Sequence, residues 1–119
     1  MKKFTLILAS LLLATLSVSA AVVPPSYPGG EEAMQKFIKE NLKYPEMSKE
    51  MGIEGVVNVQ FTVKADGSIG SIKIVRMIDP DLEQEAIRLV KTMPSWTPAT
   101  DNGSPVDATA TVAIPFTLE

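Results

Sequence analysis

Four carboxylates stand close together in the second half of the chain, and closely placed carboxylates are the residues that glycoside hydrolysis uses. They are Asp79, Asp81, Glu83 and Glu85. All four lie at the start of a segment with helical spacing, where acidic side chains stabilise the positive end of the helix dipole. This structural role needs no active site, so we expect no catalytic residue here.

Other residue types that carry chemistry are missing from the sequence. It contains no histidine and no cysteine, which excludes histidine-based triads, zinc held by His or Cys, thiol nucleophiles and disulfides. The "PGG" at 28–30 lacks the pattern of a phosphate-binding loop. The formal net charge of −3 disfavours nucleic acid as a partner. We therefore predict a protein that is not an enzyme, with no cofactor, no metal site and no small-molecule substrate.

The most informative stretch is the last one, "VDATATVAIPFTLE", at residues 106–119. From Val106 to Leu118 every second residue is apolar, which is the period of a β-strand with one buried face. Pro115 has no N–H to donate, so we expect this strand at the edge of its sheet. Natural proteins rarely leave a long edge open. The pattern fits an ordinary edge strand, in which Pro115 only prevents aggregation, as well as a strand whose edge has a function.

The first twenty residues have the composition of a secretory signal peptide. Lys2 and Lys3 precede an apolar run at 4–18, and small residues follow up to Ala20. The alternative is an uncleaved inner-membrane anchor, but this run is shorter than the about 20 residues that span a bilayer. We therefore expect cleavage after Ala20, then a Pro- and Gly-rich linker at 21–29, and one domain at 30–119.

Two amphipathic helices and one hairpin are predicted before the last strand. The first helix covers 31–42, and Pro45 stops the chain from continuing it. The hairpin covers 56–77, with "ADGS" as its tight turn and a bulge near Gly70. The second helix has Asp79 as its N-cap and Pro80 at its first position, and it ends before Pro94.

This order of elements predicts the fold. A helix that joins the hairpin to the last strand favours a last strand parallel to the second hairpin strand, with the first hairpin strand between them. The result is an α+β two-layer sandwich: a three-stranded sheet of order two-one-three with both helices on one face. We expect Trp96 in the core. We also expect the methionines there as flexible filler, namely Met34, Met47, Met51, Met77 and Met93.

Several segments resemble the carboxy-terminal domain of TonB-type energy transducers. They are "YPGGEEAMQKFIKENLKYP", "GIEGVVNVQFTVKADGSI", "DLEQEAIRLVKTMPSWTPATDNGSPV" and the final "IPF", and together they cover 25–116. The resemblance implies the fold above, a periplasmic location and a part in TonB-dependent transport. It also implies that a short segment of an outer-membrane receptor, or of another TonB-system protein, pairs with the last strand. The residues so implied are Ala108, Thr109, Ala110, Thr111, Val112, Ala113 and Ile114.

One feature differs from a full transducer, which needs a long stalk to cross the periplasm. Only residues 21–27 separate the apolar run from the domain, and they extend over roughly 25 Å at most. We therefore expect a binding module rather than a chain that transduces energy alone. The alternative is a structural or assembly module, in which two copies pair through the same edge strand as a homodimer.

Overall fold

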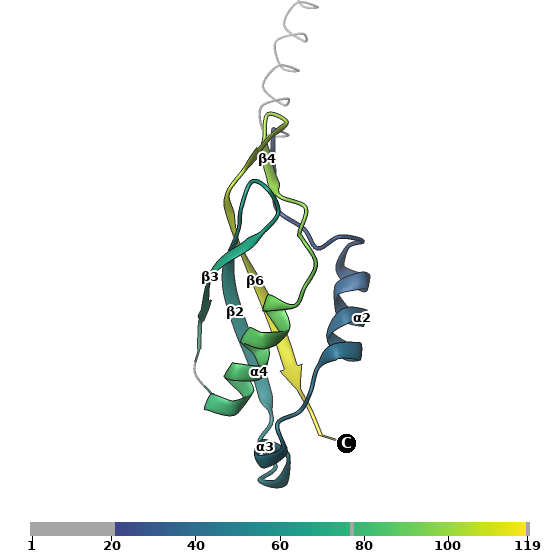
Figure 1. Ribbon diagram of the computed structural model, residues 1–119, viewed down its shortest axis with the longest axis vertical. Coiled ribbons are helices and arrows are strands. Elements are labelled where there is room, and N and C mark those ends of the chain that lie inside the picture. The colour runs from purple at the N-terminus through teal and green to yellow at the C-terminus, as the bar shows by residue number, and fades with distance from the viewer. Residues whose placement is uncertain (1–20, 77, 119) are drawn as a thin grey trace, which may run out of the picture.

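The computed structural model describes residues 21–76 and 78–118, so the predicted signal peptide lies outside the described part. The main sheet contains β2 (Gly55–Val63), β3 (Ile69–Ile74) and β6 (Ala108–Phe116). Its order is β3-β2-β6, and β2 is antiparallel to both neighbours (Figure 1). This confirms the predicted order, with the first hairpin strand in the middle and the last strand at an edge.

The hairpin has both predicted irregularities. Gly67 takes a φ of 89° in the turn, and the Lys64 N–H donates to the Ser68 carbonyl at 2.8 Å. Gln60 faces Lys73, whereas Thr62 faces Gly70, so β3 carries one residue more than β2 between these pairs. This bulge lets three isoleucines of β3, which do not share one parity, all pack against the core: Ile69, Ile72 and Ile74.

Three helices are present in the described residues: α2 (Glu31–Asn41), α3 (Glu46–Glu50) and α4 (Pro80–Lys91). The Asp79 side chain caps α4 by accepting from the Leu82 N–H at 3.1 Å, as predicted. α4 lies across β2 and β3, and α2 lies beside β6 (Figure 1). Both helices pack into one core with the inward side chains of the sheet. Its largest fully buried members are Val57, Val59, Phe61, Val63, Leu82, Leu89, Val90, Val112, Ile114 and Phe116.

A second, smaller sheet was not expected. It consists of β1 (Val22–Val23), β4 (Ala99–Asp101) and β5 (Ser104–Val106), in the order β1-β4-β5. The expected linker thus contributes a strand, and the loop after Trp96 folds into a hairpin. Asn102 and Gly103 form its turn with φ values of 55° and 85°, which suits a two-residue hairpin loop. The last strand also differs from expectation: it is interrupted at Asp107, whose side chain accepts from the Ala65 N–H at 2.8 Å.

Large core side chains were predicted with mixed success. Trp96 is buried as expected, with its ring edge-on to Phe61 at a centroid distance of 5.2 Å. Met34 and Met93 are also buried, but Met47 and Met51 are 60% and 69% exposed. The prediction for these two was wrong because α3 is a five-residue helix at one end of the sheet. The fifth methionine expected in the core, at position 77, lies outside the described residues.

Candidate functional site

The edge formed by β6 is the feature of the fold that can bind another chain. β6 pairs with β2 along its whole length, from Ala108 opposite Val63 to Phe116 opposite Gly55. Among residues 21–76 and 78–118, no strand pairs with its other side. A row of main-chain donors and acceptors therefore faces away from the sheet.

The register shows which residues supply these outward groups. Along β2, the Asn58 carbonyl accepts from the Val75 N–H at 3.0 Å, so Asn58 directs its main-chain groups toward β3. Asn58 faces Ala113 of β6, and the two form a non-hydrogen-bonded pair of the antiparallel ladder. In such a pair the main-chain N–H and C=O groups of both residues point away from the partner strand. The main-chain groups of Ala113 therefore point to the open edge. Every second residue of β6 shares this orientation, namely Thr109, Thr111, Ala113 and Pro115.

This alternation divides the seven residues predicted for the site. The N–H groups of Thr109, Thr111 and Ala113 face outward, whereas Ala108, Ala110, Val112 and Ile114 bond to β2. Pro115 has the outward orientation, so its missing N–H costs the sheet no hydrogen bond, and its carbonyl remains an acceptor. The position of Pro115 was the sequence signal that could have identified the outward set.

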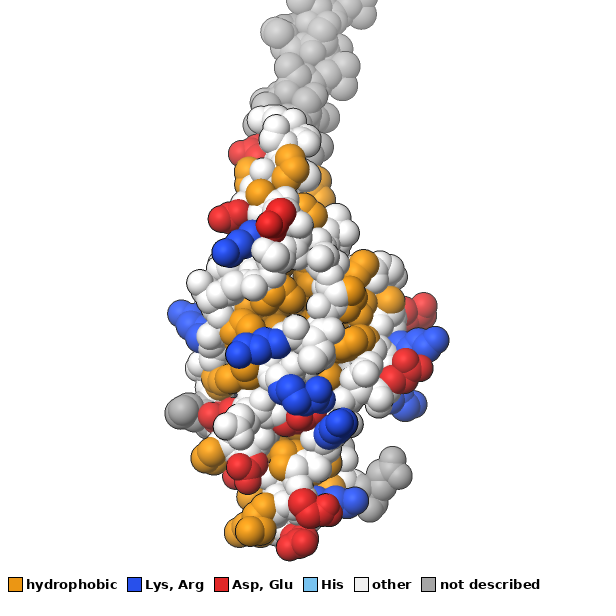
Figure 2. All heavy atoms as spheres, viewed as in Figure 1, with side chains coloured by type: hydrophobic (Ala, Val, Ile, Leu, Met, Phe, Trp, Pro, Cys, Tyr) orange, Lys and Arg blue, Asp and Glu red, His pale blue; other side chains and the backbone are white. Residues whose placement is uncertain are grey.

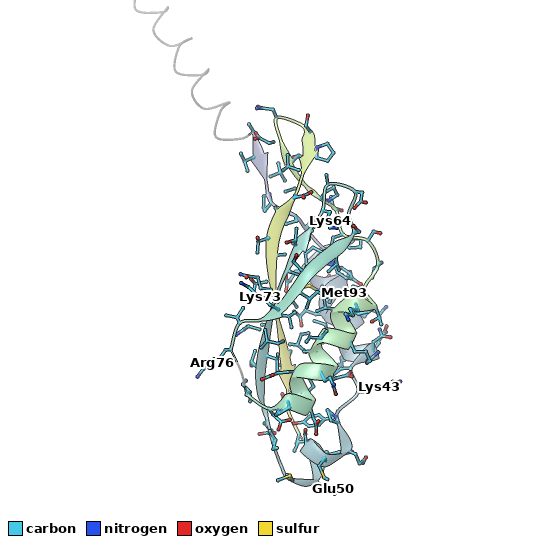
Figure 3. All side chains as sticks on the ribbon, turned by 60° about the vertical axis from the view of Figure 1, so that its left-hand side comes forward. Lys43, Glu50, Lys64, Lys73, Arg76 and Met93 are labelled. Carbon is cyan, nitrogen blue, oxygen red and sulfur yellow. The ribbon has the colours of Figure 1, made fainter. Side chains whose placement is uncertain are left out.

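The two faces of β6 have different surroundings. Val112, Ile114 and Phe116 are buried in the core, and this fixes the strand in place. The side chains of the outward set lie on the sheet face that no helix covers, and they are exposed. Lys73 and Arg76 project from the side of the sheet away from α4 (Figure 3). The core therefore holds β6 in place, and the other face of the strand is exposed to solvent.

A groove of about 410 Å³ lies where the end of β6 meets α2. Four of its lining residues share one face of α2 and the turn after it, with spacings of three, four and seven residues: Gln35, Ile38, Lys39 and Leu42. Tyr44, Pro115 and Thr117 complete the lining. The Tyr44 hydroxyl donates to the Ile53 carbonyl, and its ring stands edge-on to Phe116 at 5.6 Å. The groove therefore has a fixed and largely apolar floor beside the open edge.

The acidic cluster serves the fold. Asp79 caps α4 and accepts from the Ser48 hydroxyl at 3.1 Å, and Glu83 accepts from the Ile78 N–H at 2.7 Å. Glu85 accepts from the Lys43 N–H at 2.7 Å and pairs with Arg88 at 2.8 Å. Burial alone would raise the pKa of Glu85, but the hydrogen bonds from Arg88 and from the Lys43 N–H outweigh it and lower this pKa. Asp79, Glu83 and Glu85 are thus engaged in bonds that hold α4 and the segments around it in place.

The remaining surface offers few other sites. The face that carries α2 and α4 shows positive and negative side chains interspersed rather than a patch of one sign (Figure 2). In the described part of the chain, His, Cys, Asp and Glu nowhere gather in a group of three that could hold a metal ion. No helix between residues 21 and 118, position 77 aside, has the length and apolar character to cross a bilayer.

Comparisons with known proteins agree with this architecture. The chain is 38% identical over 69 residues to the TonB protein of one Helicobacter pylori strain, and 40% identical over 60 residues to that of another. These matches cover 57% and 50% of this chain, but only 25% and 21% of the relatives' length. The solution structure of the H. pylori TonB carboxy-terminal domain superposes with a TM-score of 0.55 at 29% identity, covering 71% of this chain and 77% of that one.

The family model described as Gram-negative bacterial TonB protein C-terminal matches residues 40–118. This range contains all three strands of the main sheet, α4 and the whole β6 edge. The family consists of energy transducers for transport and not of enzymes, which confirms the expectation that the chain is not an enzyme. The chain belongs to the family of TonB carboxy-terminal domains.

Proposed function

We propose that this chain is a periplasmic TonB-like module that captures an extended peptide by strand addition to β6. The peptide would be a segment of an outer-membrane receptor or of another TonB-system protein. The observation that carries the proposal is the open edge itself, where three N–H groups in a row, those of Thr109, Thr111 and Ala113, face away from β2. Main-chain bonds would supply affinity, and side-chain contacts would supply selectivity.

The two edges of the main sheet differ in a way that supports this proposal. β3 is six residues long, contains the bulge with Ser71 at a φ of 48°, and carries Lys73, all of which are devices that discourage edge pairing. β6 is nine residues long, pairs in regular register, and contains no charged residue. Pro115 removes only one outward donor near its end. Devices against pairing at one edge, and their absence at the other, are expected when the second edge binds an extended peptide, here called the guest strand.

Family membership supports the class of partner. TonB-system proteins and their receptors are the partners that the family implies, and an exported chain with residues 1–20 removed would meet them in the periplasm. This chain spans about a quarter of the length of its curated relatives, and the role we propose for it is capture of the peptide.

The test is a titration of the ¹⁵N-labelled domain, residues 21–119, with amino-terminal peptides of TonB-dependent receptors from the same organism. We expect chemical-shift changes along β6, and slowed amide exchange at Thr109, Thr111 and Ala113 only. Exchange at Ala110, Val112 and Ile114 should stay slow with and without peptide. Shifts that change with protein concentration in the absence of peptide would instead indicate the homodimer. If no peptide alters β6 and the domain stays monomeric, strand addition is wrong.

A photo-crosslinking amino acid at Thr111 then identifies the natural partner in cell-envelope extracts. Its matched control carries the same group at Gln60, which faces Thr111 from the central strand of the same uncovered face. A partner that pairs with the edge crosslinks from position 111 and much less from position 60. Equal crosslinking from both positions would mean that the partner covers the open face of the sheet and does not pair with β6.

A further inference from the structure

The groove beside β6 lies on the path of any strand added to the open edge. Pro115, near the end of β6, and Thr117, just after it, both line the groove, and Gln35 and Leu42 line it from α2 and the turn that follows. A fourth strand would therefore run beside the helix that flanks β6 in Figure 1. Because side chains of a strand alternate between faces, every second guest side chain would turn toward α2 and the others toward solvent.

The lining sets the chemistry of the side chain that fits. Ile38, Leu42, Tyr44 and Pro115 contribute apolar atoms to the lining, and the polar groups of Gln35 and Lys39 lie at exposed positions. Gln35 is also held by a hydrogen bond of 3.0 Å to Glu31. A polar guest side chain would lose water here and find few partners, whereas an apolar one would cover surface that is otherwise wet.

We propose that this groove is the specificity-determining part of the strand-addition site, and that it receives an apolar side chain of the guest near Pro115. The inference rests on the proposed function, because it assigns selectivity to the same edge. The outward main-chain groups of β6 can bind any extended peptide. The groove then selects peptides whose side chains toward α2 are apolar. The exposed face of α2 is then a binding surface, in addition to its part in the core.

The test uses two synthetic peptides and two matched variants. One peptide alternates threonine and valine over seven residues with a lysine at each end, and the other has serine in place of each valine. Lys39→Trp fills the groove with an indole, whereas Lys36→Trp makes the same change on the same helix at an exposed position outside the groove. Both variants lose one positive charge, so charge cannot explain a difference between them.

We expect the threonine–valine peptide to shift Thr109, Thr111, Ala113 and Leu42, and the serine peptide to bind at least tenfold more weakly. Lys39→Trp should weaken the first peptide at least tenfold with an unchanged melting temperature, and Lys36→Trp should bind like the parent domain. Equal affinity for both peptides, or equal affinity of both variants, overturns the groove assignment while edge binding survives. If neither peptide shifts the edge residues, strand addition and the groove assignment fail together.

Discussion

Two alanines of β6 allow the orientation of the open edge to be tested by one chemical change. Ala113→Pro removes an outward N–H that bonds to nothing in the described residues, and Pro115 already occupies an equivalent position. Ala110→Pro removes an inward N–H, because the register makes Ala110 exchange hydrogen bonds with Phe61. Both variants share the restriction that the proline ring places on φ, so their difference isolates the hydrogen bond.

The size of the difference follows from the surroundings of Phe61, which is 1% exposed. Its carbonyl would lose its donor where water does not reach, at a cost of about 1–3 kcal/mol. For a domain of this size, about 4–8 °C in melting temperature corresponds to each kcal/mol, so Ala110→Pro should melt roughly 4–24 °C below Ala113→Pro. Circular dichroism gives the melting temperatures, and urea unfolding gives the free energies.

A bulk control completes the test, since Ala110 is half-buried. Ala110→Val adds a side chain of similar size but keeps the N–H, so it should melt well above Ala110→Pro. Equal melting temperatures for the two proline variants, or a lower one for Ala113→Pro, would mean that the outward set has been assigned to the wrong residues. The peptide-binding argument would then have to be rebuilt on Ala110, Val112 and Ile114.

Three further predictions concern the scaffold. Trp96→Ala should cost about 3–5 kcal/mol in urea unfolding, because the indole is buried between Phe61 and Tyr27, and a cost below about 1 kcal/mol would contradict this packing. Gly67→Ala should destabilise more than Gly103→Ala: both have positive φ, but a Cβ at Gly67 would lie 2.6 Å from the Trp96 carbonyl oxygen, whereas one at Gly103 meets nothing within 4 Å. Because the pKa of Glu85 in the folded state lies below the ordinary 4.5, its stabilising contribution is present above that value and is lost as the pH falls through the lowered pKa. Glu85→Gln should therefore flatten the loss of stability on acidification, and an unchanged acid profile would argue against the Glu85–Arg88 pair.

The main sheet could be predicted because its signals are local and redundant. The hairpin has a turn of known chemistry at Asp66-Gly67, and α4 has both an N-cap at Asp79 and a proline after it. Once these elements are placed, the antiparallel hairpin and the crossover leave few sheet orders. The edge position of β6 followed from Pro115, and the structure confirms it.

The smaller sheet had no comparable signal. Its strands are two or three residues long, too short for an alternation to be visible. The pairing of Val22 with Asp101 joins residues at opposite ends of the chain, and sequence periodicity says nothing about such contacts. The turn at Asn102-Gly103 was the one available clue, since Asn-Gly is a strong hairpin signal.

The groove could not be predicted for the same reason. It forms where α2 meets residues 115 and 117, which are far from α2 in the sequence. The exposure of Met47 and Met51 could not be predicted from the sequence either. Apolar content alone does not distinguish a core methionine from a surface one, and the short α3 has no regular stripe that could decide it.

The energetics of strand addition give an independent reason to expect side-chain recognition. The outward set offers three N–H donors and four carbonyl acceptors, and at about 1 kcal/mol net for each hydrogen bond they supply roughly 7 kcal/mol. Ordering the backbone of a seven-residue guest costs about 1–2 kcal/mol for each residue, or roughly 7–14 kcal/mol. β6 itself adds no such cost, because its buried face already holds it in place. Main-chain bonds alone therefore leave a deficit of up to roughly 7 kcal/mol, and about three apolar side chains buried at about 1.5–3 kcal/mol each would offset it. A serine-only guest that bound as tightly as the valine peptide would show that this balance is wrong.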